Sequence, residues 1–266
     1  MGARVIVVTS GKGGVGKTTS TANIAVSLAK MGKKVVAVDA DIGLRNLDMV
    51  MGLEGRVVYN FINVIEKECR LNQALVRDRR VENLFLLPAA QTRTKDAVTP
   101  EQMTELCEQL RPDFDFVLLD CPAGIEGGFK NAAAGADEAL VVTTPEVPAV
   151  RDADRIIGML DSMGKSPIRL IINRFRANMV QKGDMLPMED ILEILSIKLI
   201  GVVPEDDTVI KATNRGEPLT FAHDSPAALA YGNIASRIMG EDVPFLALSP
   251  QKGGGLLASL KRMFGF

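Results

Sequence analysis

Residues 10–19 read SGKGGVGKTT, and this glycine-rich stretch constrains the fold of the chain more than any other. A short β-branched run, RVIVV, precedes it and predicts a buried strand, while helical periodicity follows it. The pattern Gly11-x-x-x-x-Gly16-Lys17-Thr18 between a strand and a helix is typical of a phosphate-binding loop. The alternative is a glycine turn with a surface lysine, and the strand-to-helix context argues against it.

Each residue type in the loop has a physical reason to bind phosphate. Glycines let backbone N–H groups turn inward around phosphate oxygens, and the helix that begins near Lys17 adds the positive end of its dipole. We expect Lys17 to lie against the β and γ phosphates and the Thr18 hydroxyl to bind Mg²⁺. The predicted nucleotide-binding residues of the loop are Gly11, Lys12, Gly13, Gly14, Val15, Gly16, Lys17, Thr18 and Thr19.

The rest of the chain alternates β-branched runs with helical periodicity, which indicates an α/β fold with a mostly parallel, twisted sheet and helices on both faces. Right-handed crossovers place the loops that follow the strands at one edge of this sheet, where ligands collect. The predicted strands are seven, at 4–8, 34–38, 84–88, 114–119, 138–143, 168–172 and 199–203. Helices are predicted at 18–31, 58–66, 100–110, 149–163, 188–195, 209–213 and 226–239.

Composition is that of an ordinary globular chain, which we expect to form one domain at residues 1–248. The 266 residues carry 31 basic and 33 acidic side chains, so bulk charge does not predict a nucleic-acid partner. No stretch approaches the roughly 18 apolar residues that span a bilayer, and the N-terminal run resembles a strand rather than a signal peptide. We therefore expect a cytoplasmic protein. Its three cysteines never form C-x-x-C, which predicts reduced thiols.

Acidic residues follow two of the predicted strands. The segment VVAVDADIGLRN places Asp39 and Asp41 where the second strand ends, and residues two apart on an extended chain face the same way. In FDFVLLDCPAGIE an apolar run precedes Asp120, which we expect to hold Mg²⁺ through water. Ordinary acidic strand ends are the alternative. No side chain is placed as a covalent nucleophile, so water is the expected attacker.

The end of the chain differs in composition from the rest. Residues 249–255, SPQKGGG, predict a flexible tether before a short terminal helix at 256–266. Wound as a helix, the apolar residues fall within a stripe of roughly 120°. Lys261 and Arg262 lie outside it, so a membrane-surface helix is predicted, and packing on the domain's own core is the alternative. The stripe consists of Leu256, Leu257, Leu260, Met263 and Phe264.

The sequence as a whole resembles the MinD branch of the ParA/MinD family of P-loop ATPases, whose phosphate loop is the deviant Walker A motif. The resemblance extends over nearly the whole chain and includes KGGVGKTT, DADIGLRNLDMVMGLE, PAAQTR, DCPAGIE, PEVPAVRDADRI, GDMLPMEDILEIL and GVVPEDDTV. It implies a three-layer P-loop NTPase fold and an ATPase that uses ATP and Mg²⁺.

The resemblance assigns roles to particular residues. Lys12 matches a lysine that reaches across a dimer interface to phosphates bound by the other subunit, where it can stabilise the charge that develops on the transferring phosphoryl group. Asp41 is implied to orient the attacking water and to order the metal shell. The catalytic set is thus Lys12, Lys17 and Asp41, and the metal set is Thr18, Asp41 and Asp120. A solvated loop lysine is the alternative for Lys12.

Further implied roles concern the base and the partners. Asn173 would read the adenine edge, and Arg174 with Pro204, Glu205 and Asp206 would wall the ring. Asp152 and the neighbouring Arg151 match the partner-docking surface of the family. The alternatives are an asparagine that forms a turn and a solvated helix start.

The family implies an ATP-dependent homodimer on the inner face of the cell membrane, attached to anionic lipids. It would recruit the division inhibitor MinC, and MinE or another spatial regulator would control it, so that the division septum is correctly placed. A DNA-segregation ATPase of the ParA type is the alternative, but it needs a basic face, whereas the pI is 5.6 and the tail is lipophilic. An iron–sulfur scaffold would need paired cysteines.

Overall fold

The structure is a computed structural model that describes residues 2–91, 93, 97–125, 127–222 and 224–248. The predicted tether at 249–255 and the predicted terminal helix at 256–266 lie outside the described residues. Within them the chain forms a sheet of eight strands, β1 (Arg4–Thr9), β2 (Val35–Asp39), β3 (Val76–Arg77), β4 (Leu84–Leu87), β5 (Phe116–Asp120), β6 (Glu138–Thr143), β7 (Ile168–Phe175) and β8 (Lys198–Pro204).

The sheet has the strand order β3-β4-β2-β5-β1-β6-β7-β8. All neighbouring pairs are parallel except β3 with β4, so the predicted mostly parallel α/β sheet is confirmed. The helix after β1 packs on one face of the sheet, whereas the helix after β5 packs on the other. Such a reversal leaves a crevice at the carboxyl ends of the strands.

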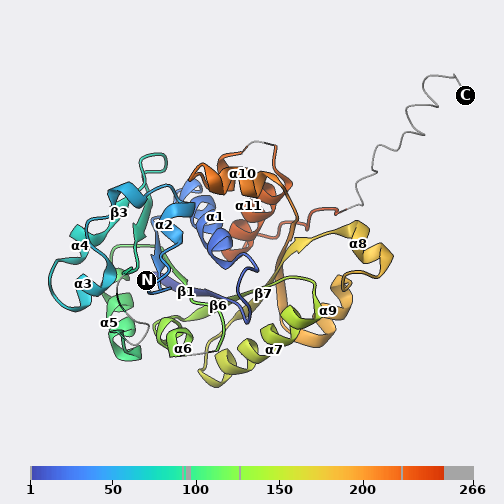
Figure 1. Ribbon diagram of the computed structural model, residues 1–266, viewed down its shortest axis with the longest axis horizontal. Coiled ribbons are helices and arrows are strands. Elements are labelled where there is room, and N and C mark those ends of the chain that lie inside the picture. Colours follow the sequence, from blue (N-terminus) through green and yellow to red (C-terminus); the bar gives the residue numbers. More distant parts are fainter. Residues whose placement is uncertain (1, 92, 94–96, 126, 223, 249–266) are drawn as a thin grey trace, which may run out of the picture.

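Helices form a layer on each face of the sheet (Figure 1). One layer contains α1 (Lys17–Lys30), α2 (Leu47–Val50), α10 (Thr208–Asn214), the 3₁₀ helix η3 (Leu219–Phe221) and α11 (Pro226–Ile238). The other contains α3 (Phe61–Ile65), α4 (Leu71–Ala74), α5 (Pro100–Leu110), α6 (Gly127–Ala134), α7 (Val147–Ser162) and α9 (Met188–Leu195). The short η1 (Glu54–Arg56) and α8 (Ala177–Lys182) bury none of their residues.

The central strands are apolar along most of their length because helices cover both of their faces. Every residue of β2 and of β5 is buried, including the aspartate at the end of each strand. Among the described helices, none is both long and apolar enough to cross a bilayer.

Several predicted boundaries are wrong for local reasons. One strand, β3, is absent from the seven predicted strands, because it has only two residues and is too short to show a hydrophobic period. The predicted helix at 58–66 shortens to α3, because the Asn60 side chain accepts the N–H of Ile62 and caps the helix there. The predicted helix at 149–163 begins earlier, at Val147. Four short helices, α2, α4, α6 and α8, are absent from the prediction.

The contact between β8 and α11 generates a stability prediction. A Cβ at Gly201 would collide with the Ile234 side chain of α11, whereas a Cβ at Gly232 would meet open space. We expect Gly201→Ala to lower the free energy of unfolding by about 1–3 kcal/mol through overpacking. Gly232→Ala, within a helix, should raise it by up to about 1 kcal/mol. Urea unfolding monitored by circular dichroism measures both, and equal effects would contradict the described packing.

Candidate functional site

The carboxyl ends of β1, β2 and β5 bring the predicted phosphate loop and the predicted acids together. Asp120 is in register with Val8 of β1 on one side and with Asp39 of β2 on the other. The loop that follows β1 therefore leaves the sheet beside both carboxylates. Gly124, in the loop after β5, donates its N–H to the Ser10 carbonyl at 3.1 Å, which holds that loop against the start of the phosphate loop.

The phosphate loop ends in a helix start that is suited to anions. Gly14 and Gly16 have φ angles of 77° and 96°, in the left-handed region that glycine adopts without strain. Gly16 is the N-cap of α1 and provides no side-chain acceptor for the first amides of the helix. Unsatisfied amides and the helix dipole together favour a phosphate at this point. Lys17, the first residue of α1, is only 9% exposed.

Two close backbone approaches hold this loop in place. A Cβ at Gly11 would collide with the backbone of Asp152 on α7, and a Cβ at Gly16 would collide with the Asn173 amide on β7. The Asn173 amide also donates to the Val15 carbonyl at 2.8 Å. The loop is thus packed against α7 on one side and against the end of β7 on the other.

Asp120 is the carboxylate best placed to hold a metal. It is buried, it accepts the Thr21 hydroxyl at 3.0 Å, and it also interacts with the Thr18 hydroxyl. Burial raises its pKa to about 6, although these hydroxyls and Lys17 oppose the rise. A buried carboxylate next to hydroxyl oxygens fits Mg²⁺, which prefers hard oxygen ligands. Thr21 was not among the predicted metal-site residues, although it lies one helical turn beyond Thr18.

The metal site would need oxygen atoms from outside the protein. Within the described ranges, no group of three or more His, Cys, Asp or Glu side chains could hold a metal ion by itself. This agrees with Mg²⁺ chemistry, because this ion is usually bound by one or two protein oxygens together with substrate phosphates and water. The donors present therefore suit a magnesium nucleotide better than a resident metal.

Asp39 supports the loop that carries Asp41. Its two carboxylate oxygens accept the N–H of Asp41 at 3.0 Å and the N–H of Leu47 at 3.1 Å. It thereby fixes both ends of the 41–46 loop, one of which bears the predicted water-orienting residue. Burial and the neighbouring Asp120 raise the pKa of Asp39 to about 7, and the two N–H bonds only partly oppose this.

Lys12 differs from Lys17 although both belong to the same loop. The Lys12 side chain is 48% exposed, and its ammonium lies 4.0 Å from a Glu146 carboxylate oxygen. The Ser10 hydroxyl donates to the Lys12 carbonyl at 2.7 Å, so the backbone is fixed while the side chain extends outward. Glu146 is the N-cap residue of α7, and nothing in the linear sequence indicated its contact with the loop.

The predicted base-side residues lie together at the ends of β7 and β8. Phe175 pairs with Pro204, and the Glu205 N–H donates to the Phe175 carbonyl at 3.1 Å. Arg174 is exposed and has a φ of 56°. Asp206 accepts the Ser225 hydroxyl at 2.6 Å and the Thr208 N–H at 2.8 Å, and these bonds lower the pKa of its carboxyl. The Asp206 carboxylate therefore braces α10 and α11.

The predicted partner residues lie in the first two turns of α7. Arg151 is exposed, and Asp152 pairs with Arg155 at 3.7 Å while its backbone packs on Gly11. A surface at this place is in direct contact with the phosphate loop.

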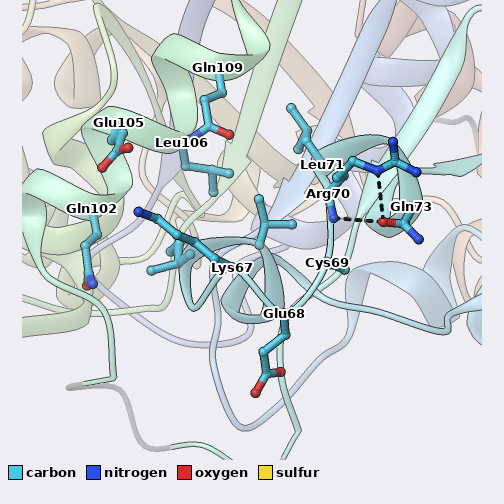
Figure 2. Close-up of a pocket in the computed structure, with 12 residues that line it drawn as sticks. Lys67, Glu68, Cys69, Arg70, Leu71, Gln73, Gln102, Glu105, Leu106 and Gln109 are labelled. Atoms are coloured by element: carbon cyan, nitrogen blue, oxygen red, sulfur yellow. Dashed lines mark hydrogen bonds between the residues drawn. The ribbon is translucent and has the colours of Figure 1, made fainter.

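One of the open grooves lies away from these residues. It has a volume of about 730 Å³ and is formed by the ends of α3 and α4 facing α5, as Figure 2 shows. Its wall mixes cations such as Lys67 and Arg70 with the acids Glu68 and Glu105. None of the predicted nucleotide-binding or metal-binding residues lines it, so volume alone does not identify the site.

The raised pKa of Asp39 generates a prediction for pH dependence. Because the folded state binds this proton more tightly than the unfolded chain, the contribution of Asp39 to stability falls as pH rises from about 4 through 7. Without nucleotide and with a chelator, we expect the unfolding free energy of the natural chain to decline relative to that of Asp39→Asn by about 1 kcal/mol per pH unit between pH 5 and 7. Urea titrations at several pH values measure this, and parallel pH profiles would refute the assignment.

Sequence comparison places the chain among known proteins. The model of the CobQ/CobB/MinD/ParA nucleotide-binding domain family matches residues 6–219. The septum site-determining protein MinD of Synechocystis is 57% identical over 244 residues, 91% of this chain and 92% of the relative. That of Bacillus subtilis is 53% identical over 262 residues, 98% of this chain and 97% of the relative.

Solved structures of MinD proteins also superpose on the chain. MinD in the MinC:MinD cell division complex of Aquifex aeolicus superposes with a TM-score of 0.86 at 49% identity, covering 91% of this chain and 98% of that one. Pyrococcus horikoshii MinD, complexed with Mg-ADP, gives 0.79 at 32% identity, with coverages of 89% and 96%. The chain therefore belongs to the CobQ/CobB/MinD/ParA nucleotide-binding family and, within it, to the MinD septum site-determining ATPases.

Proposed function

We propose that the chain is an ATP-dependent switch: two copies close around ATP and Mg²⁺, bind the inner face of the cell membrane, and recruit MinC to control where the division septum forms. The position of Lys12 carries this proposal. Its side chain extends outward from a loop whose other lysine is buried. An exposed cation at the edge of a phosphate site could act on phosphates held by a second copy, and this supports the proposal.

The surface around the phosphate loop supports a face-to-face dimer. Three large apolar residues are exposed there, namely Leu44 at 62%, Ile125 at 47% and Val147 at 50%. Each belongs to a segment that borders the site: the loop held by Asp39, the loop held by Ser10, and the start of α7 beside Glu146. Covering these side chains would contribute free energy to dimerisation.

In the proposed dimer, each group of site residues has its own chemical role. Lys17 and the first amides of α1 bind phosphate oxygens, and Lys12 from the other copy stabilises the charge that develops on the transferred group. Asp41 orients the attacking water, and Asp39 keeps it in position. When bound, Mg²⁺ neutralises phosphate charge, and Thr18 and Asp120 would hold it with Asp41 ordering its shell. Asn173, Arg174 and residues 204–206 form the base side.

We propose that the terminal helix predicted from the sequence attaches the chain to the membrane. A helix of about 11 residues is unfolded alone, so lipid binding must also supply its ordering, and one copy holds weakly. Each basic residue near an anionic surface adds only about 1 kcal/mol. In a dimer the second insertion is intramolecular, which raises residence by about 10²-fold or more. ATP binding would thus control attachment to the inner face of the membrane.

Partner recruitment is proposed at α7. The Aquifex aeolicus relative was solved as a MinC:MinD complex, and we infer that this chain binds the division inhibitor MinC through a surface that includes Arg151 and Asp152. The backbone of Asp152 contacts the phosphate loop, so the surface can respond to nucleotide. MinE or another regulator would act on the same dimer.

A lysine substitution tests the role of Lys12 in the dimer. We expect Lys12→Ala to bind ATP within about threefold of the natural chain but to lose at least about 100-fold in turnover, because a cation supplied in trans acts chiefly on the transition state. Phosphate release and nucleotide titration measure the two quantities. Lys182→Ala, an exposed lysine on α8, is the control. Normal turnover of Lys12→Ala would exclude the proposed role.

A charge placed in the terminal stripe tests membrane attachment. We expect Leu260→Glu to abolish ATP-dependent sedimentation with anionic vesicles, because a carboxylate would have to enter the lipid boundary. Ser259→Glu, adjacent but outside the apolar stripe, adds the same charge and should reduce sedimentation much less. The assay is run with ATP, with ADP and without nucleotide, alongside the oligomeric state. Vesicle binding by a monomer regardless of nucleotide would contradict the switch.

A further inference from the structure

The ends of α2 and α10 meet at a backbone contact that lies outside the predicted nucleotide-binding and metal-binding residues. Gly52 and Gly216 have φ angles of 64° and 62°. A Cβ on Gly52 would collide with the Gly216 carbonyl oxygen, and a Cβ on Gly216 would lie 3.0 Å from the Gly52 Cα. α2 begins where the 41–46 loop ends, and α10 follows the base-side segment 204–206. The contact therefore joins the far ends of the two elements that border the site.

Arg80, from the loop between β3 and β4, bridges this contact. One guanidinium nitrogen donates to the Met51 carbonyl at the end of α2, and the other donates to the Gly216 carbonyl at 3.3 Å. Asp78 orients the Arg80 guanidinium. Its buried carboxylate accepts two hydrogen bonds from the guanidinium, at 2.6 and 3.1 Å. A planar guanidinium can make these bonds at once, whereas a lysine ammonium cannot reproduce their geometry.

The same guanidinium is connected to the phosphate-loop helix through Phe221. It lies 5.0 Å from the centroid of the Phe221 ring, and the Lys30 ammonium of α1 lies 4.3 Å from that centroid. Lys30 also donates to the Thr220 carbonyl at 2.6 Å, and the Thr220 N–H donates to Asn23 of α1 at 3.0 Å. Arg80 is thus the point at which α1, α2, α10 and η3 are connected.

We propose that Arg80 is a positioning residue that couples occupation of the base side to the arrangement of the loop bearing Asp41. The proposal rests on the proposed function, because it takes residues 204–206 to border the base. A base that orders residues 204–206 would also order α10, and Arg80 would connect α10 through Met51 to the 41–46 loop. The Asp39 hydrogen bonds also hold that loop. The physical link is a continuous set of hydrogen bonds and ring contacts between rigid elements.

Two variants break the link in different ways. Arg80→Lys keeps a cation beside the buried Asp78, so that carboxylate is not left unpaired. The substitution removes the two guanidinium nitrogens that donate to the Met51 and Gly216 carbonyls. Gly52→Ala leaves Arg80 unchanged and forces the ends of α2 and α10 apart. Arg77→Lys is the matched control, because Arg77 belongs to the same hairpin and its side chain, which is 56% exposed, interacts with Glu82.

The measurement is amide hydrogen exchange of the full chain with Mg²⁺ and either ADP or pyrophosphate, each at saturation. Pyrophosphate fills the phosphate loop alone, whereas ADP also fills the base side. In the natural chain and in Arg77→Lys, we expect ADP to slow exchange in residues 41–53 at least about fivefold more than pyrophosphate does. In Arg80→Lys and Gly52→Ala that difference should fall below about twofold, while both ligands still bind.

The comparison of ADP with pyrophosphate distinguishes two effects of a substitution: loss of coupling between the base side and residues 41–53, and a general loosening of those residues. A merely structural role would speed exchange equally with ADP and with pyrophosphate and would leave their difference intact, which would overturn the proposal. So would a natural chain in which the two ligands protect residues 41–53 equally. Failure of the natural chain to bind either ligand would instead contradict the proposed nucleotide site, and this inference with it.

Discussion

Two buried carboxylates placed side by side are the constraint on which the site depends. Asp39 and Asp120 are paired in register at the ends of β2 and β5, and burial raises the pKa of both, to about 7 and about 6. Holding both ionised without a cation costs free energy, since each is desolvated and the like charge of Asp120 acts on Asp39. The nearby Lys17 relieves part of that cost. Binding of a divalent cation would relieve more, so nucleotide binding and stability are linked.

The phosphate loop is packed without clearance on two sides. Gly11 touches the backbone of α7, and Gly16 touches the Asn173 side chain at the end of β7. Any side chain at either glycine would displace the element opposite. We therefore expect that a movement of the loop on phosphate binding would also move its neighbours. α7 carries the proposed partner surface and β7 carries the proposed base side. The phosphate loop is therefore in direct contact with the elements that carry the proposed partner surface and the proposed base side.

The sequence predicted those parts of the structure that depend on local periodicity and spacing. The sheet, its parallel character and the collection of Lys17, Asp39 and Asp120 at one edge followed from apolar runs and from the glycine spacing. Contacts between segments far apart in the chain could not be predicted in this way. Glu146 beside Lys12 and the Asn173 amide on the Val15 carbonyl depend on how α7 and β7 pack against the loop. Short elements such as β3 lack enough residues to show a period.

The weak pairing of Lys12 with Glu146 would make the proposed switch reversible. The two charged atoms lie 4.0 Å apart and both side chains are about half exposed, so solvent screens their attraction and the pair contributes little to stability. Lys12 can therefore leave Glu146 for a more concentrated negative charge, such as the phosphates of a second copy. Its departure would leave Glu146, the N-cap residue of α7, without its cation. Formation of the dimer would then change the charge at the start of the helix that carries Arg151 and Asp152. In the proposed function, this change would connect the nucleotide state to partner recognition.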